Sequence, residues 1–151
     1  MLVARRLATI VAAIAIALFA SVSSTTTAEA AANVRFSYVQ YNSPGSDYGS
    51  NYSLNQEYIK IKNYGAKAKQ LKGWTVRDAA GHVYTFGYLN LKPGATVTLH
   101  TGKGSNTVKH RYWKQTWYIW NNDGDKAVLK NSRGVTLDAC KWGSSGSAKA
   151  C

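Results

Sequence analysis

The chain has 151 residues, a length typical of one domain, and its formal net charge is +12 because 19 Lys and Arg outnumber 7 Asp and Glu. A chain of this size buries enough surface to fold around a hydrophobic core, so it does not depend on a structural metal. The charge favours polyanionic partners such as nucleic acid, teichoic acid or acidic glycans, although solubility alone explains it equally well.

The first thirty residues have the composition of a secretory signal peptide. Arg5 and Arg6 precede an apolar run from residue 7 to 20, and Ala28-Glu29-Ala30 fits a small-x-small cleavage site. The run is shorter than the roughly 18 apolar residues of a membrane span, and no later segment is apolar enough to span. We therefore expect a secreted protein of residues 31–151, cleaved after Ala30, with a formal net charge of +11.

Short strands separated by turn residues follow the signal peptide. Residues 33–42 (NVRFSYVQYN) alternate as a strand, and residues 43–55 have the composition of a loop. In QEYIKIKNYG, Glu57 shares one face with Ile59 and Ile61. A carboxylate on a core face needs a partner, so Glu57 is expected in a structural ion pair or in backbone hydrogen bonds rather than in catalysis.

Two hairpins and a further strand are predicted downstream. LKGWTVRDAAGHVYTF turns at residues 78–81, where Gly81 can adopt a left-handed conformation. A strand over residues 95–100 follows a Pro-Gly turn, and DKAVLKNSRGVTLDAC turns at residues 131–134. Seven or eight short strands without a sustained helical period predict an all-β sandwich or barrel.

Four segments together resemble the lamin tail domain in its secreted bacterial form. They are EYIKIKNYG, LKGWTVRDAAGHVYTF, LKPGATVTLHTG and WNNDGDKAVLKNSRGVTLD, within residues 56–138. The resemblance implies an immunoglobulin-like β-sandwich. It also implies an interaction module: the domain engages DNA and proteins in animal lamins and accompanies surface enzymes in bacteria. The positions that match the family pattern are Glu57, Trp74, Arg77, Asp78, Gly81, Trp120, Asn121, Asn122, Gly124 and Asp125.

Aromatic side chains are concentrated in YWKQTWYIW, residues 112–120. Strand alternation would separate Trp117 and Ile119 from Tyr118 and Trp120, and the family motif implies that Trp120 and Trp74 belong to the core. The remaining aromatics would face outward or lie at the sandwich end, interleaved with basic residues that suit phosphates and stacked rings. The candidate binding residues are Lys109, Arg111, Tyr112, Trp113, Lys114 and Trp117.

The sequence NNDGD (residues 121–125) alternates oxygen-bearing side chains but does not match a calcium-binding loop. Gly124 stands at position 4 rather than 6, and Ser132 stands where the loop requires Glu. A tight turn held by Asn and Asp side chains fits better. The sequence predicts no metal and no cofactor.

The two cysteines, Cys140 and Cys151, are expected to form a disulfide in an oxidising compartment. Its expected role is to hold the Gly/Ser-rich tail against the last strand.

Three functions are compatible with the sequence. The first is a non-catalytic module that binds a polyanion or a cell-surface component through Lys, Arg and aromatic residues. The second is a protein-interaction domain with incidental charge, and the third is a small hydrolase of the nuclease kind that would use the scattered histidines. No nucleophile or phosphate-loop motif supports an enzyme. The oligomeric state and the convergence of the lysines, among them Lys60, Lys62, Lys67, Lys69, Lys72 and Lys103, are not fixed by the sequence.

Overall fold

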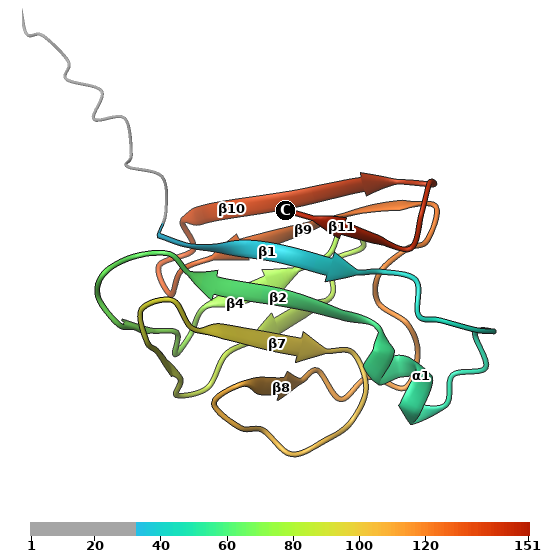
Figure 1. The fold of residues 1–151 in the computed structure, drawn as a ribbon, viewed down its shortest axis with the longest axis horizontal. Helices are drawn as coiled ribbons and strands as arrows, with labels where there is room; N and C mark the ends of the chain where they lie inside the picture. Colours follow the sequence, from blue (N-terminus) through green and yellow to red (C-terminus); the bar gives the residue numbers. More distant parts are fainter. Residues whose placement is uncertain (1–32) are drawn as a thin grey trace, which may run out of the picture.

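The computed structural model describes residues 33–151, which form two β-sheets packed face to face (Figure 1). The predicted signal peptide and its cleavage site after Ala30 lie outside the described residues. Over residues 33–151, none of the helical structure has the length and apolarity that crossing a membrane requires.

The first sheet has five strands in the order β11-β1-β2-β7-β8. Neighbouring strands are antiparallel except β7 and β8, which are parallel. The strands are β1 (Val34–Gln40), β2 (Tyr58–Asn63), β7 (Thr96–His100), β8 (His110–Tyr112) and β11 (Ala148–Ala150).

The second sheet has the order β10-β9-β4-β5, and a short two-stranded sheet pairs β3 with β6. Both predicted hairpins are present, as β4–β5 and β9–β10, and Gly81 and Gly134 have φ angles of 103° and 79° in their turns. The strands are β3 (Lys69–Gln70), β4 (Thr75–Arg77), β5 (Val83–Thr85), β6 (Asn90–Leu91), β9 (Gly124–Lys130) and β10 (Thr136–Gly143). The described chain thus has more strands than predicted, because several of two or three residues carry too little alternation to be recognised.

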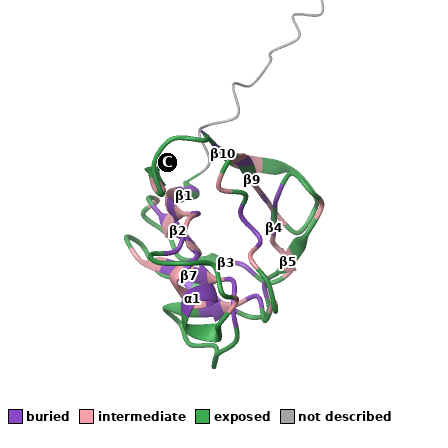
Figure 2. Cartoon of the chain, turned by 90° about the vertical axis from the view of Figure 1, so that its right-hand side faces the viewer, coloured by how far each residue is buried: buried purple, intermediate pink, exposed green. Residues whose placement is uncertain are grey.

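The inward residues of both sheets form one core, and connecting loops carry most of the exposed residues (Figure 2). Strict alternation along β2 and β7 buries Ile59, Ile61, Val97 and Leu99, as a half-buried strand requires. Two facing sheets with a shared apolar interior are the predicted immunoglobulin-like β-sandwich.

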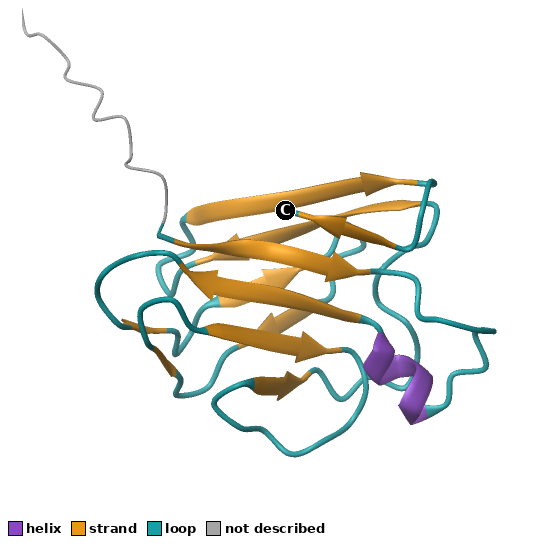
Figure 3. Cartoon of the chain, in the orientation of Figure 1, coloured by secondary structure: helices purple, strands orange, loops and turns teal. Residues whose placement is uncertain are grey.

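A short helix replaces part of the loop predicted over residues 43–55. Helix α1 (Asn51–Gln56) stands at one end of the sandwich (Figure 3). The Ser50 side chain caps it by accepting a hydrogen bond from the Ser53 amide at 3.2 Å. Six residues are fewer than two turns, so no apolar period marks the helix in the sequence.

The predicted disulfide joins Cys140 and Cys151 and holds the end of the tail at β10, and the tail also forms a further strand, β11. Cys140 belongs to β10 in the second sheet, whereas Cys151 follows β11, which pairs with β1 in the first sheet. The disulfide therefore connects the two sheets at one edge of the sandwich.

Candidate functional site

The outer face of the five-stranded sheet gathers cations and aromatic rings. The alternation that buries Ile59 and Ile61 turns Lys60 and Lys62 outward. The register then places Arg35 of β1 opposite Lys62 and Tyr38 opposite Lys60. Residues distant in the sequence thus meet on one face through strand pairing.

A row of rings crosses this face over four strands. Tyr38 stacks on Tyr58 with ring centroids 6.1 Å apart, and Tyr58 lies 5.8 Å from His100. His100 stacks on Tyr112 at 5.0 Å and on His110 at 5.2 Å. Contacts between rings restrict their rotation, which prearranges the face for a ligand.

The cations lie over the faces of these rings. The Lys60 ammonium is 5.4 Å from the ring centroids of both Tyr38 and Tyr58. Arg35 and Lys62 lie 4.6 and 5.0 Å from the Tyr64 ring. Such cation–π contacts position a positive charge without neutralising it.

Within the described residues, none of these cations has a carboxylate partner. The ion pair found within residues 33–151 joins His82 to Asp78, away from this face. The face is hollowed into a depression of about 430 Å³, which we call the basic groove. Its lining residues are Ser37, Lys60, Lys62, Tyr64, Thr96, Thr98, Lys109 and His110.

Two histidines stand at the border of the basic groove. His100 Nδ1 lies 2.8 Å from the Asn55 carbonyl, which only accepts, so Nδ1 carries the proton. The Nε2 of neutral His100 can then accept from His110 Nδ1 at 2.9 Å. Burial lowers the pKa of His100 below its ordinary value, and the charge of His110 lowers it further. The hydrogen bond to the Asn55 carbonyl raises the pKa, but by less. His100 is therefore neutral at pH 7 and serves to fix the rings around it.

The structure separates the six predicted binding residues. Lys109 lines the basic groove, and Tyr112 belongs to its ring row. Arg111 alternates to the inner side: it is 8% exposed, and its guanidinium donates to the Thr107 and Tyr88 carbonyls. The prediction that Arg111 lies free for a ligand is therefore wrong.

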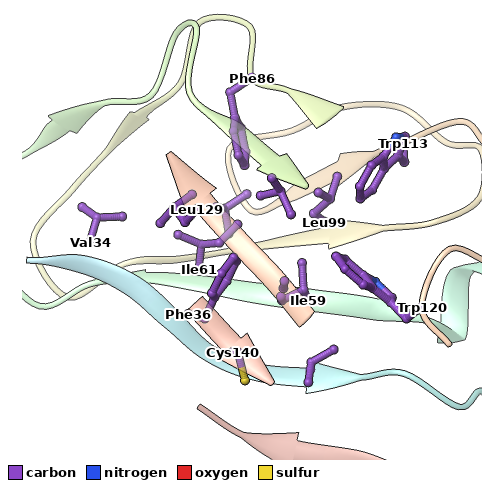
Figure 4. Close-up of a cluster of buried hydrophobic side chains, with 14 of the residues drawn as sticks. Val34, Phe36, Ile59, Ile61, Phe86, Leu99, Trp113, Trp120, Leu129 and Cys140 are labelled. Atoms are coloured by element: carbon purple, nitrogen blue, oxygen red, sulfur yellow. The ribbon is translucent and has the colours of Figure 1, made fainter. Parts of the chain in front are cut away.

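The prediction that Trp113 faces outward is also wrong. Trp113 is 8% exposed and packs in the core against Tyr84 and Trp120, at ring distances of 5.9 and 5.7 Å (Figure 4). Strand β8 ends at Tyr112, and Lys114 has a positive φ of 64°, so the alternation assumed through this stretch is interrupted. For the same reason Ile119 and Trp120 are adjacent in sequence and both buried.

Trp117 is exposed, but it lies at the helical end of the molecule and does not line the basic groove. Its indole packs against Gly49, before α1. Lys114 is exposed and also does not line the basic groove. The groove residues that sequence reasoning missed as binding residues are Ser37, Tyr64, Thr96, Thr98 and His110. It also missed Arg35, Tyr38 and Tyr58, which lie on the same face outside the groove lining. The one sequence signal for this face is the alternation along β2, which places Lys60 and Lys62 on the side opposite Ile59 and Ile61.

The family-pattern residues build turns at the sandwich end. The Asp125 carboxylate accepts from the amides of Ala79, Asn121 and Lys126 at 3.1, 3.1 and 2.7 Å. Asp78 accepts from the Gly81 and His82 amides. These bonds explain NNDGD as a turn, and residues 33–151 contain no cluster of three or more side chains suited to a metal.

Substitution of Asp125 by Ala is expected to lower the free energy of unfolding by about 2 kcal/mol, because three amides lose a charged acceptor. Chemical denaturation measures this change. The matched control is Asp123→Ala in the same turn, whose exposed carboxylate accepts no hydrogen bond within the described residues. Equal losses of unfolding free energy in the two variants would contradict the role of the Asp125 carboxylate in stabilising the turn.

Glu57 holds two loops together at this end of the sandwich, through Thr101 and Ile119. It is fully buried, and its Oε1 accepts from Thr101 Oγ1 at 2.6 Å and from the Ile119 amide at 2.8 Å. Its Oε2 has no hydrogen-bond partner within the described residues. Desolvation by burial raises the pKa of Glu57 to about 7. Of the two expected arrangements, hydrogen bonds are found rather than an ion pair, and Arg77 is exposed.

Comparison with known proteins identifies a family for this chain. The family model described as Lamin Tail Domain matches residues 27–144, which include both sheets except β11. A search of curated proteins found no match.

Proposed function

Because the chain belongs to the lamin tail domain family, we propose that it is a secreted, non-catalytic binding module that engages a polyanion through the basic groove. The β-sandwich of this family is an interaction domain. The disulfide supports secretion, since such bonds persist in oxidising compartments. The observation that carries the proposal is the set of uncompensated cations on one face: Arg35, Lys60, Lys62 and Lys109.

Cations without carboxylate partners release condensed counterions when they meet a polyanion, which supplies affinity that depends steeply on salt. Stacked rings between them offer contacts to bases or sugars. Nucleic acids, teichoic acids and acidic glycans share the required chemistry of closely spaced negative charges on a chain. The net charge of +11 over residues 31–151 would further accelerate encounter with any of them.

Double substitution of Lys60 and Lys62 by Gln is expected to weaken binding to fluorescent single- and double-stranded DNA by roughly 10-fold at about 100 mM salt, and to reduce the salt slope by about two. Both lysines point away from the core, so the fold is retained. The measurement is fluorescence anisotropy of the protein from residue 31 onward, across salt concentrations and with teichoic acid as competitor.

The matched control is Lys126→Gln/Lys141→Gln, which removes the same charge from paired positions on the second sheet. It should change affinity much less. Equal weakening in both double variants would show that only the net charge of the protein matters. It would contradict the proposal that polyanions bind at the basic groove. No binding of any polyanion at low salt would overturn the proposal.

A protein partner is the second candidate function. A mostly apolar hollow of about 320 Å³ beside the basic groove includes Leu91, Ala95 and Val108, and Val108 is 72% exposed. Lys92 and Lys109 also line this hollow, but binding through its apolar residues would depend much less on salt than polyanion binding. The salt dependence of binding therefore distinguishes the two functions.

A further inference from the structure

A third hollow, of about 490 Å³, lies at the end of the sandwich. Three segments form it: the loop at Asp47, the hairpin turn at residues 79–82, and residues 117–125. We call it the end pocket. From its lining we propose that the end pocket is a saccharide-binding site, separate from the basic groove and independent of the proposed function.

The aromatic wall of the end pocket is Trp117, which is 60% exposed but held in place. A Cβ added to Gly49 would approach the indole to 2.6 Å, so the ring lies directly against the glycine backbone. The Tyr118 ring meets it edge-on at 5.5 Å, and the Tyr118 hydroxyl lies 2.6 Å from Ser53 Oγ. An indole fixed in this way offers a ready surface to the apolar C–H face of a sugar ring.

The turn that follows Trp117 is also preorganised. The Asn121 carbonyl accepts from the Trp142 indole N–H at 3.0 Å, and the Asn121 amide donates to Asp125. Ile119, two residues earlier, is anchored by Glu57 through its amide. A pocket whose walls are fixed before binding loses little entropy when a ligand enters.

The polar groups of the end pocket suit hydroxyls. Asn122 donates to Asp47 at 3.3 Å, and this pair presents an amide and a carboxylate side by side. The side chains of Asn121 and Asp123 make no hydrogen bond within the described residues and remain available. Amides and carboxylates can bind neighbouring hydroxyls as paired donors and acceptors.

The charge of the end pocket excludes the ligands of the basic groove. Among the described residues, no Lys or Arg lines it, although the chain contains 19. Asp47 and Asp123 would repel phosphates or sulfates. The Asp125 carboxylate is occupied by backbone amides, and the His82 ring in the lining is held by Asp78 through Nδ1. A ligand therefore meets the aromatic wall, the hydroxyl-binding groups and the free edge of the His82 ring. A neutral saccharide has an apolar ring face that fits the Trp117 wall and hydroxyl groups that fit the polar side chains.

Isothermal titration calorimetry with cellotriose, maltotriose and the trisaccharide of N-acetylglucosamine tests the proposal. At least one should bind, and Trp117→Ala should weaken it by about 10-fold or more. Asp123→Ala should weaken it by about 3- to 10-fold, since it removes a charged acceptor. The matched aromatic control is Tyr88→Ala, which is 75% exposed outside the end pocket and should bind as the unmodified protein does.

The Lys60→Gln/Lys62→Gln variant should bind the saccharide normally even if it no longer binds polyanions. If the unmodified protein binds no polyanion, the proposed function fails but the saccharide proposal does not. Absence of heat with all three trisaccharides would overturn the saccharide site. So would undiminished binding by Trp117→Ala.

Discussion

The free energy of unfolding is expected to fall by about 3 kcal/mol when Cys140 and Cys151 are both replaced by Ala. The disulfide closes a loop with a sequence separation of 11, and the entropy that this removes from the unfolded chain corresponds to about that value. It also joins the two sheets, because it links β10 of one sheet to the end of β11 in the other. Urea denaturation under oxidising conditions measures the difference.

Reduction provides the control. A thiol reductant should destabilise the unmodified protein by a similar amount and leave the double alanine variant unchanged. A variant as stable as the unmodified protein would show that the link between the sheets contributes nothing beyond their packing.

A second large effect concerns pH. The pKa of Glu57 is about 7 in the folded protein, whereas an unburied glutamate carboxyl has a pKa of 4.5. Between these values the folded state holds a proton that the unfolded state has released, so stability falls as pH rises and the loss is complete above pH 7. The difference corresponds to about 3 kcal/mol between pH 4 and pH 8.

Substitution of Glu57 by Gln isolates this contribution. The free energy of unfolding of the unmodified protein, minus that of Glu57→Gln, should decline across this range. Taking the difference removes the contribution of His100. Its lowered pKa acts in the opposite direction, because protonation at low pH destabilises its half-buried ring. A constant difference from pH 4 to pH 8 would show that burial does not hold the proton on Glu57.

Patterns of neighbouring residues in the sequence predict the buried face of β2 and both hairpin turns. Alternation over residues 57–61 revealed which face of β2 is buried, and with it the enclosed carboxylate of Glu57. Glycines at residues 81 and 134 identified both hairpin turns, because their left-handed conformations are accessible without strain. These features depend on neighbours in the sequence, which is why a single sequence contains them.

The candidate site depends on distant neighbours. Lys60 meets Tyr38 through the pairing of β1 with β2, and Thr98 meets His110 through the parallel pairing of β7 with β8. No local period encodes such partners. Alternation extended beyond Tyr112, where the strand ends, predicts an outward Trp113, and that prediction is wrong. Aromatic clustering alone therefore identified a region in which core and surface rings are mixed.

The return of the tail to β1 has a further consequence for self-assembly. An open strand edge can template addition of another chain. Here β11 pairs with residues 38–40, the Cys151 amide donates to the Ser37 carbonyl, and the Phe36 amide donates to the Asp138 carboxylate at 2.8 Å. In the oxidised protein β1 is therefore covered, and the strand at this edge of the sheet is the three-residue β11. A strand this short is a poor template for another chain. Before oxidation, only non-covalent contacts hold the tail on β1, among them the three residue pairs of β11 and the Cys151 amide bond to Ser37. Disulfide formation in the folded chain is therefore expected to keep β11 over this strand.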